Sequence, residues 1–206
     1  MIPASVNTIL FDYGGVLIDI NYTKTIKAFE NMGIERFDEL YAQAAQTALF
    51  DDYEIGAISS QRFINGLLNY LPKGINPNQV VAAWNAMLLG VPKKSIELLN
   101  SLKCKYDLFM LSNTNDIHIH KANQLWNSTS PGTSPHDYFE KVYYSFEIGM
   151  RKPHKETFEA VLKLMGKKPA EVLFIDDSIQ HIEGAKSAGI HTHHLQSIHD
   201  LESVFS

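Results

Sequence analysis

The chain has 206 residues, of which 45% are hydrophobic and 20% charged, a composition that favours a folded globular protein over a disordered one. Its net charge of -5 argues against a protein that binds nucleic acid or anionic membranes. The single cysteine, Cys104, cannot form an internal disulfide, and we find neither a signal peptide nor an apolar run long enough to span a membrane. We therefore expect a cytoplasmic monomer or homodimer whose partner is a small molecule, without nucleic acid or membrane.

The first predicted element is a buried strand over residues 6–11. Its apolar run, VNTILF, stops at Asp12 and leads into the glycine pair Gly14 and Gly15. An unbroken apolar run of this length is typical of a parallel strand that is covered on both faces. We expect the strand to end at Asp12 and the chain to turn at the two glycines.

The segment after this turn has a helical pattern. Apolar residues three and four positions apart predict one helix around residues 26–32 and a second over residues 37–49. Ser59 is the predicted N-cap of a third helix, and Asn76 followed by Pro77 begins a fourth. We expect four consecutive helices with no strand between them.

The fourth helix is expected to end at Gly90, where the pattern changes again. Beyond this point apolar strands alternate with amphipathic helices, and a polar surface loop is predicted over residues 127–137. Four strands are predicted here, at residues 107–111, 142–144, 171–175 and 190–195. Such alternation predicts an α/β fold, a Rossmann-like parallel sheet core with helices on both faces. The expected organisation is a core formed by residues 1–17 and 91–206, with an inserted all-helical cap over residues 18–90.

Three of the predicted strands end in polar residues that can do chemistry. Asp12 and Ser112 each follow one strand, and the pair Asp176 and Asp177 follows another. Because ligands of open parallel sheets bind outside the carboxyl ends of the strands, we expect these side chains to converge. Convergent carboxylates repel one another, and Mg²⁺ with oxygen ligands is the usual remedy. Lys152 adds a second positive charge if its loop returns to the same edge.

Four short motifs carry these residues. They are TILFDYGGVLID around Asp12, LFMLSNTND around Ser112, GMRKP around Lys152 and VLFIDDSIQHIEGAKSAGI around Asp176 and Asp177. In this order they resemble the four motifs of the haloacid dehalogenase superfamily, and the resemblance extends over the whole chain. The helical insertion after the first motif resembles the helical cap of that family. The motifs look most like those of a bacterial subgroup that contains glucose-1-phosphate phosphatases.

This resemblance implies a Mg²⁺-dependent phosphatase that hydrolyses a small phosphorylated metabolite, such as a sugar phosphate, through an aspartyl-phosphate intermediate. Asp12 would be the nucleophile, because a carboxylate nucleophile divides one difficult displacement into two easier steps. The resemblance places Mg²⁺ between Asp12, the backbone carbonyl of Gly14 and Asp177. Asp176 would reach the metal mainly through water.

The same resemblance implies which residues bind the phosphoryl group. Ser112 would donate a hydrogen bond to this group, and Lys152 would offset the charge of the nucleophile. The turn at Gly14 and Gly15, together with Asn113, would complete the substrate-binding set.

The position of Gly14 is the one departure from the family pattern. Phosphatases of this family usually carry a second aspartate there, two residues after the nucleophile, as general acid and base. Loss of a general acid typically costs about 10²–10⁴ in rate. The loss is smallest for a good leaving group such as the anomeric oxygen of a sugar 1-phosphate. This favours a sugar phosphate as substrate.

Two other functions are open at this point. A haloacid dehalogenase would use the same nucleophile without a metal and would need no acid at position 14, although the pair Asp176 and Asp177 argues against it. A catalytically silent binding module is favoured by Gly14 alone. A phosphomutase is disfavoured, because returning the phosphoryl group to a second hydroxyl would need the missing acid and base.

Several further residues of interest lie outside the four motifs. His191, His193 and His194 have the spacing of a strand, but no thiolate or carboxylate partner is evident there, so we interpret them as a solvated end strand and not as a zinc site. His118, in the helix beyond the second motif, has no assigned role. Residues 51–59 are expected to form a loop that faces the active site and selects the substrate.

Overall fold

The computed structural model describes residues 2–34 and 48–206. The helix predicted over residues 37–49 therefore lies outside the described residues, apart from its last two positions. Within the described ranges, no helix is both long and apolar enough to cross a membrane.

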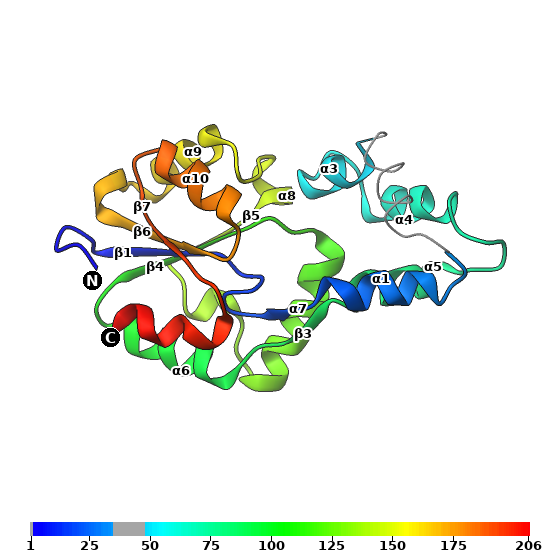
Figure 1. Cartoon of the computed structure of the whole chain (residues 1–206), viewed down its shortest axis with the longest axis horizontal. Helices are drawn as coiled ribbons and strands as arrows, with labels where there is room; N and C mark the ends of the chain where they lie inside the picture. Colours follow the sequence, from blue (N-terminus) through cyan, green and yellow to red (C-terminus); the bar gives the residue numbers. More distant parts are fainter. Residues whose placement is uncertain (1, 35–47) are drawn as a thin grey trace.

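A five-stranded parallel sheet forms the centre of the fold (Figure 1). In spatial order its strands are β5 (Lys141–Tyr144), β4 (Asp107–Ser112), β1 (Thr8–Phe11), β6 (Val172–Asp176) and β7 (His191–His194). All four residues of β1 are buried because this strand lies in the middle of the sheet with both faces covered. The predicted α/β class and the predicted strands are confirmed, with ends that differ by one or two residues.

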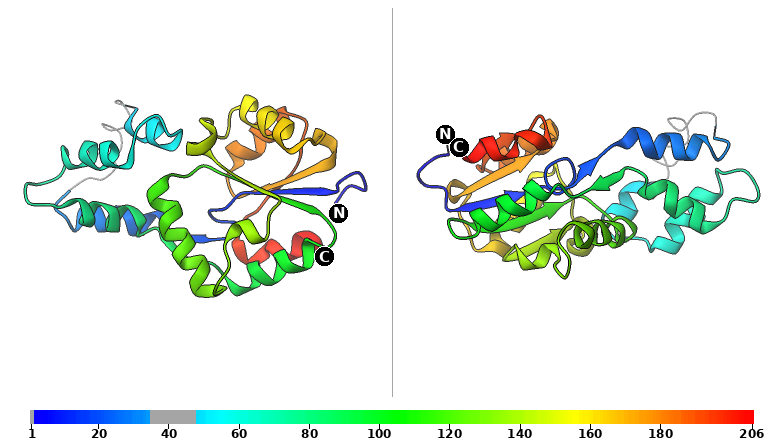
Figure 2. Two further views of the ribbon diagram at one scale, coloured as in Figure 1. Left: turned by 180° about the vertical axis from the view of Figure 1, so that it is seen from behind. Right: turned by 90° about the horizontal axis from the view of Figure 1, so that it is seen from below.

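Helices cover the sheet on both faces, as Figures 1 and 2 show. One face carries α6 (Lys93–Leu102), α7 (Asp116–Thr129) and the 3-10 helix η3 (Ile198–Phe205). The other face carries α9 (Lys155–Met165) and α10 (Ile179–Ser187). Successive residues of a strand point to opposite faces, so Ile9 and Phe11 pack in the first core and Leu10 packs in the second.

A group of helices follows β1 and lies to one side of the sheet (Figure 1). Its members are α1 (Tyr22–Glu30), α3 (Leu49–Glu54), α4 (Ser60–Leu68) and α5 (Pro77–Asn85). The predicted caps are confirmed: Ser59 accepts a hydrogen bond from the backbone of Arg62, and Asn76 forms a capping box with Gln79. These helices enclose a third apolar core, which includes the fully buried Phe29 and Phe63.

The expectation that no strand occurs between residues 18 and 90 is wrong. The short strands β2 (Asp19–Ile20) and β3 (Leu88–Gly90) pair antiparallel where the chain leaves and re-enters the region of the sheet. Gly90 is therefore the last residue of a strand, and the fourth helix ends earlier, at Asn85. The physical reason is local pairing, because the Asn21 backbone N–H donates to the Met87 carbonyl at 2.8 Å and holds the two passages together.

Two predicted loops also contain helix. Residues 51–59 overlap α3, which runs to Glu54, and residues 127–137 overlap the end of α7 at Thr129. Besides β2 and β3, five helical elements were not predicted, namely η1 (Pro135–Asp137), α8 (Ser145–Ile148), η2 (Pro169–Glu171), η3 and α3 itself. Isolated helices of this length are marginal, so tertiary contacts and not local periodicity decide whether they form.

Candidate active site

Three carboxylates meet at the carboxyl edge of the sheet. Asp12 directly follows β1, Asp176 is the last residue of the neighbouring strand β6, and Asp177 comes next along the chain. Each offers an oxygen within 4.8 Å of the others. Asp12 and Asp176 are buried, whereas Asp177 is exposed. Adjacent parallel strands that end at the same edge bring Asp12 and Asp176 together although they are 164 positions apart in the sequence.

Lys152 reaches the same place from the loop between α8 and α9. Its Nζ lies 2.7 Å from an oxygen of Asp12, 2.7 Å from an oxygen of Asp176 and 3.0 Å from the Leu111 carbonyl, which accept its three hydrogen bonds. The side chain is fully buried. Asn113 fixes the loop, because its side-chain oxygen accepts from the Lys152 backbone N–H and its NH₂ donates to the Lys152 carbonyl, both at 2.9 Å.

The electrostatics of this cluster follow from burial and charge. Burial raises the pKa of Asp12, the repulsion of Asp176 and Asp177 raises it further, and Lys152 only partly opposes this. Burial also tends to raise the pKa of Asp176, but Lys152 and a neighbouring histidine, His181, bring it below its usual value. Burial acts against the charge of Lys152, yet its two carboxylate partners raise its pKa. Lys152 thus offsets only one of three negative charges.

The chemistry of this donor set fits a magnesium ion. Oxygen ligands at this spacing suit a hard divalent cation, and two carboxylate charges are left for it to neutralise. The glycine turn brings Asp177 close to Asp12, because Gly15 has a φ of +72° and a Cβ there would overlap the Asp177 carboxylate. Gly15 is therefore required both for the turn and for the approach of Asp177.

The remaining residues predicted for the phosphoryl group are less directly placed. Ser112 is the last residue of β4 and is buried, and it lines a small cavity of about 70 Å³ together with Gly14 and Asn113. Gly14 and Asn113 also line the cavity that contains Asp12, whereas Ser112 does not. Asn113 uses both ends of its amide to position the Lys152 loop.

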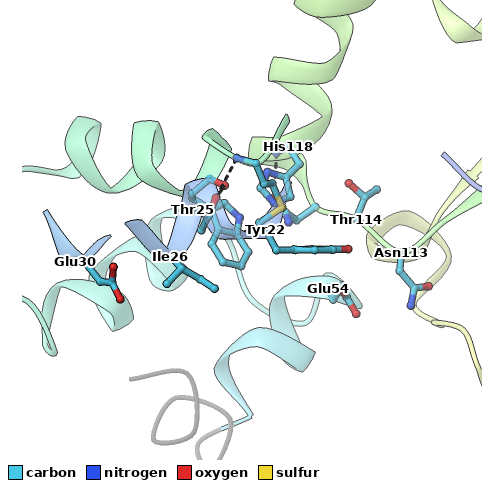
Figure 3. A pocket seen from close by; sticks show the side chains of 11 residues that line it. Tyr22, Thr25, Ile26, Glu30, Glu54, Asn113, Thr114 and His118 are labelled. Carbon is cyan, nitrogen blue, oxygen red and sulfur yellow. Dashed lines mark hydrogen bonds between the residues drawn. The ribbon is translucent and has the colours of Figure 1, made fainter. Parts of the chain in front are cut away.

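Two cavities adjoin at this edge of the sheet. The first, of about 400 Å³, contains Asp12 and Asp177. The second, of about 810 Å³, lies between the helical group and the sheet edge, and Figure 3 shows its lining residues. Three residues line both cavities, namely Tyr22, Glu54 and Asn113. A phosphoryl group beside Asp12 would therefore have its organic part in the larger cavity.

His118 is a feature of the larger cavity to which the sequence assigns no role. Its ring stacks on Trp84 with centroids 5.0 Å apart, and its Nδ1 lies 2.9 Å from the side-chain oxygen of Asn85. Burial lowers the pKa of His118 to about 3, so the ring is neutral. Because Nδ1 carries the hydrogen that Asn85 accepts, Nε2 is a hydrogen-bond acceptor. The Trp84 indole N–H is buried without a partner among the described residues.

Arg151 was also not assigned a role by the sequence analysis. It precedes Lys152 and pairs with two acidic residues of α3, Asp51 and Glu54, the latter with Nε 2.8 Å from a carboxylate oxygen. These pairs join the helical group to the loop that carries Lys152. In the sequence, only the position of Arg151 next to Lys152 could have suggested a role for it. The pairing of Arg151 with Asp51 and Glu54 depends on the folded structure.

Two histidines adjoin the carboxylates. His181, in α10, places Nδ1 3.0 Å from both oxygens of Asp176, and its helical spacing after the acidic pair is the signal that could have indicated it. In β7, the His194 Nε2 lies 2.9 Å from the Asp177 carbonyl. Across the described part of the chain, the three aspartates form the one group with metal-ligand spacing, and His191, His193 and His194 do not.

The comparisons with known proteins agree with this geometry. The family model of the haloacid dehalogenase-like hydrolases matches residues 6–189. The chain therefore belongs to the haloacid dehalogenase-like hydrolase family. This confirms the resemblance inferred from the four motifs and the expectation that the protein is a hydrolase.

Individual relatives point in the same direction. A D-ribitol-5-phosphate phosphatase of Bacteroides thetaiotaomicron is 29% identical over 187 residues, which span 91% of this chain and 90% of that protein. The structure of a HAD family enzyme from the same organism, in complex with magnesium and inorganic phosphate, is similar with a TM-score of 0.84 and 34% identity over 98% of this chain and all of that one. A HAD-like hydrolase from Porphyromonas gingivalis gives a TM-score of 0.82 and 32% identity, covering 93% and 91% of the two chains.

Proposed function

We propose that this chain is a Mg²⁺-dependent phosphatase that hydrolyses a small phosphorylated metabolite through an aspartyl-phosphate on Asp12. The observation that carries the proposal is the cluster of three carboxylates, two of them paired with the buried amine of Lys152, beside a cavity that adjoins a second one large enough for a small organic group. The family and its phosphatase relatives support the same reaction and the same metal.

Each residue of the cluster has a role in this proposal. Asp12 attacks the phosphorus atom, and the Lys152 ammonium group holds the attacking carboxylate in place and offsets its charge. Bound Mg²⁺, held by Asp12, the Gly14 carbonyl, Asp177 and, through water, Asp176, stabilises negative charge on the phosphoryl oxygens. Ser112 and Asn113, with the turn at Gly14 and Gly15, complete the site for the phosphoryl group.

The larger cavity favours a phosphorylated sugar or sugar alcohol. Its walls combine aromatic rings with polar groups that bind hydroxyls, among them the imidazole of His118 and the carboxylates of Glu30 and Glu54. The relative that acts on D-ribitol 5-phosphate supports this class of substrate. We further propose that residues 18–90 form a cap domain on a core of residues 1–17 and 91–206.

The first test is the release of p-nitrophenol from p-nitrophenyl phosphate with and without Mg²⁺, with Asp12→Asn as control. We expect metal-dependent turnover in the wild type and a loss greater than about 10³-fold in the variant, because an amide is not a nucleophile. No turnover under any condition would contradict the proposal. Chloride release from 2-chloropropionate would then distinguish a dehalogenase from a silent binding module.

The second test concerns the substrate class. The variant His118→Phe keeps an aromatic ring against Trp84 but has no acceptor. We expect it to raise KM for the sugar or sugar-alcohol phosphates that the wild type hydrolyses and to leave p-nitrophenyl phosphate hydrolysis unchanged. An equal effect on both substrates would remove His118 from substrate selection.

A further inference from the structure

Hydrolysis of an alkyl phosphate needs a group that gives a proton to the leaving oxygen and later takes one from water. Around Asp12 the ionisable groups are already bonded to one another: Lys152 donates to two carboxylates and a carbonyl, and Asp176 accepts from Lys152 and lies 3.0 Å from His181 Nδ1. Gly14, two residues after the nucleophile, has no side chain. The proton donor must come from elsewhere in the cavity.

The place to look is the junction of the two cavities. A substrate with its phosphoryl group beside Asp12 and its organic part in the larger cavity has its leaving oxygen at this junction. Tyr22, Glu54 and Asn113 line both cavities. The proton donor is expected among these three residues.

Two of the three residues do not suit the task. Asn113 does not ionise, and both ends of its amide are bonded to the backbone of Lys152. The phenol of Tyr22, whose ordinary pKa is about 10, stays protonated and cannot act as a base near neutral pH. Glu54 is the remaining residue.

The surroundings of Glu54 suit a carboxyl group that both gives and takes a proton. It lies at the end of α3, with 30% of its side chain exposed, and Arg151 Nε is 2.8 Å from its Oε2. Arg151 is in turn held by Asp51 and by the loop of Lys152. Burial raises the pKa of Glu54 and Arg151 opposes this, and the net effect is a pKa above the ordinary value, which favours the protonated form more than in a free glutamate.

We propose that Glu54 is the general acid and base of this phosphatase, supplied by the helical group in place of a side chain at position 14. In the first step an Asp12 oxygen bonds to phosphorus, the bond from phosphorus to the leaving oxygen breaks, and the proton on Glu54 moves to that oxygen to give the free alcohol. In the second step Glu54 takes a proton from water, whose oxygen bonds to phosphorus while the bond to Asp12 breaks. Phosphate leaves, and Asp12 and Glu54 return to their initial states.

This proposal rests on the proposed phosphatase function, and its test separates the two. Glu54→Gln keeps the size of the side chain and removes the ionisable proton. Glu159→Gln is the matched control, because it makes the same change at an exposed carboxylate of α9 that pairs with Lys155 and lines neither cavity. Both variants would be compared with the wild type by thermal unfolding and by rapid-mixing kinetics on p-nitrophenyl phosphate and phenyl phosphate.

With Glu54→Gln we expect p-nitrophenyl phosphate to give a burst of one p-nitrophenol per enzyme followed by slow turnover. The first step needs no acid, because p-nitrophenolate is a good leaving group. The second step is slow, because the variant lacks the base that takes the proton from water. On phenyl phosphate, whose leaving group is poorer, we expect release of phenol itself to slow by about 10²-fold or more. Glu159→Gln should retain wild-type rates.

An unchanged kcat of Glu54→Gln, with or without a change in KM, would overturn the proposal. The proposal would also be overturned if Glu54→Gln slowed the p-nitrophenol burst as much as it slowed the release of phenol from phenyl phosphate. An effect that does not depend on the leaving group would mean that Glu54 helps to assemble the site and does not transfer a proton. An inactive wild type would contradict the proposed function itself.

Discussion

Lys152 is the residue on which the electrostatics of the carboxylate cluster depend. Its ammonium group is fully buried and hydrogen-bonded to Asp12 and Asp176, each at 2.7 Å. A buried ion pair contributes little net stability as a whole, but removing one partner leaves the other charge without compensation. The stabilising role of Lys152 is therefore separate from any role in catalysis.

We expect Lys152→Met to lower the free energy of unfolding by about 3–5 kcal/mol at pH 8 without Mg²⁺. The control is Lys155→Met, which removes one partner of a half-exposed pair with Glu159 on α9 and should cost less than about 0.5 kcal/mol. Urea denaturation measures both values. Equal effects of the two substitutions would show that the buried amine does not stabilise the cluster.

The burial of His118 makes the free energy of unfolding depend on pH. Burial lowers its pKa to about 3 from the ordinary 6.5, so between these values the unfolded chain binds a proton that the folded protein does not. Stability is thus lost as the pH falls below about 6.5. A complete one-proton difference between the two states would give a slope of roughly 1.4 kcal/mol per pH unit, which is the upper bound for this residue.

We expect His118→Gln to lose stability less steeply than the wild type between pH 7.5 and pH 5. The measured quantity is the difference in free energy of unfolding between the two proteins at each pH, in which the titration of the other groups cancels. A difference that does not change with pH would mean that His118 has the same pKa in the folded and the unfolded protein.

At the scale of elements, the turn after β1 requires glycine for two reasons, namely its backbone conformation and the close approach of a side chain. Gly15 has a positive φ and a neighbouring carboxylate, that of Asp177, at the place where a Cβ would lie. Gly74 has a φ of +100° with no atom within 4 Å of such a Cβ. The two glycines share the conformational requirement and differ in the contact.

We expect Gly15→Ala and Gly74→Ala to share a backbone cost of about 1–2 kcal/mol in the free energy of unfolding. Only Gly15→Ala should also raise the Mg²⁺ concentration that gives half-maximal activity, because it displaces Asp177. Thermal unfolding and a Mg²⁺ titration of p-nitrophenyl phosphate hydrolysis measure the two effects. A Mg²⁺ response that is the same in both variants would contradict the assignment of Asp177 as a metal ligand.

At the scale of the whole molecule, the cluster couples metal binding to the stability of the fold. Asp12, Asp176 and Asp177 come from two adjacent strand ends, and Lys152 comes from a third segment. An unfolded chain does not hold these groups together. A metal that binds the cluster must therefore stabilise the folded protein.

We expect Mg²⁺ at 100 times its Kd to add about 2.7 kcal/mol to the free energy of unfolding of the wild type. Asp177→Asn should abolish this gain, and NaCl at equal ionic strength is the control. The readout is the shift of the unfolding transition and not activity. A transition that Mg²⁺ does not move would contradict a metal site at these aspartates.

The local parts of this protein were predictable from its sequence. The apolar run of residues 6–11, the caps Ser59 and Asn76 and the alternation beyond residue 91 depend on interactions between near neighbours, so periodicity and composition reveal them. The meeting of Asp12, Asp176 and Asp177 was also predictable, because strand ends of a parallel sheet meet at one edge whatever separates them in sequence.

Only the tertiary structure decided the rest. The pairing of β2 with β3, the pairs that join Arg151 to Asp51 and Glu54, the bond from His118 to Asn85 and the placement of Glu54 at the junction of two cavities all join segments far apart in the chain. No local pattern encodes such contacts, because they depend on how the helical group lies against the sheet. The sequence by itself determined the fold class and the carboxylate cluster, and the packing of the helical group over that cluster determined which other side chains face the substrate.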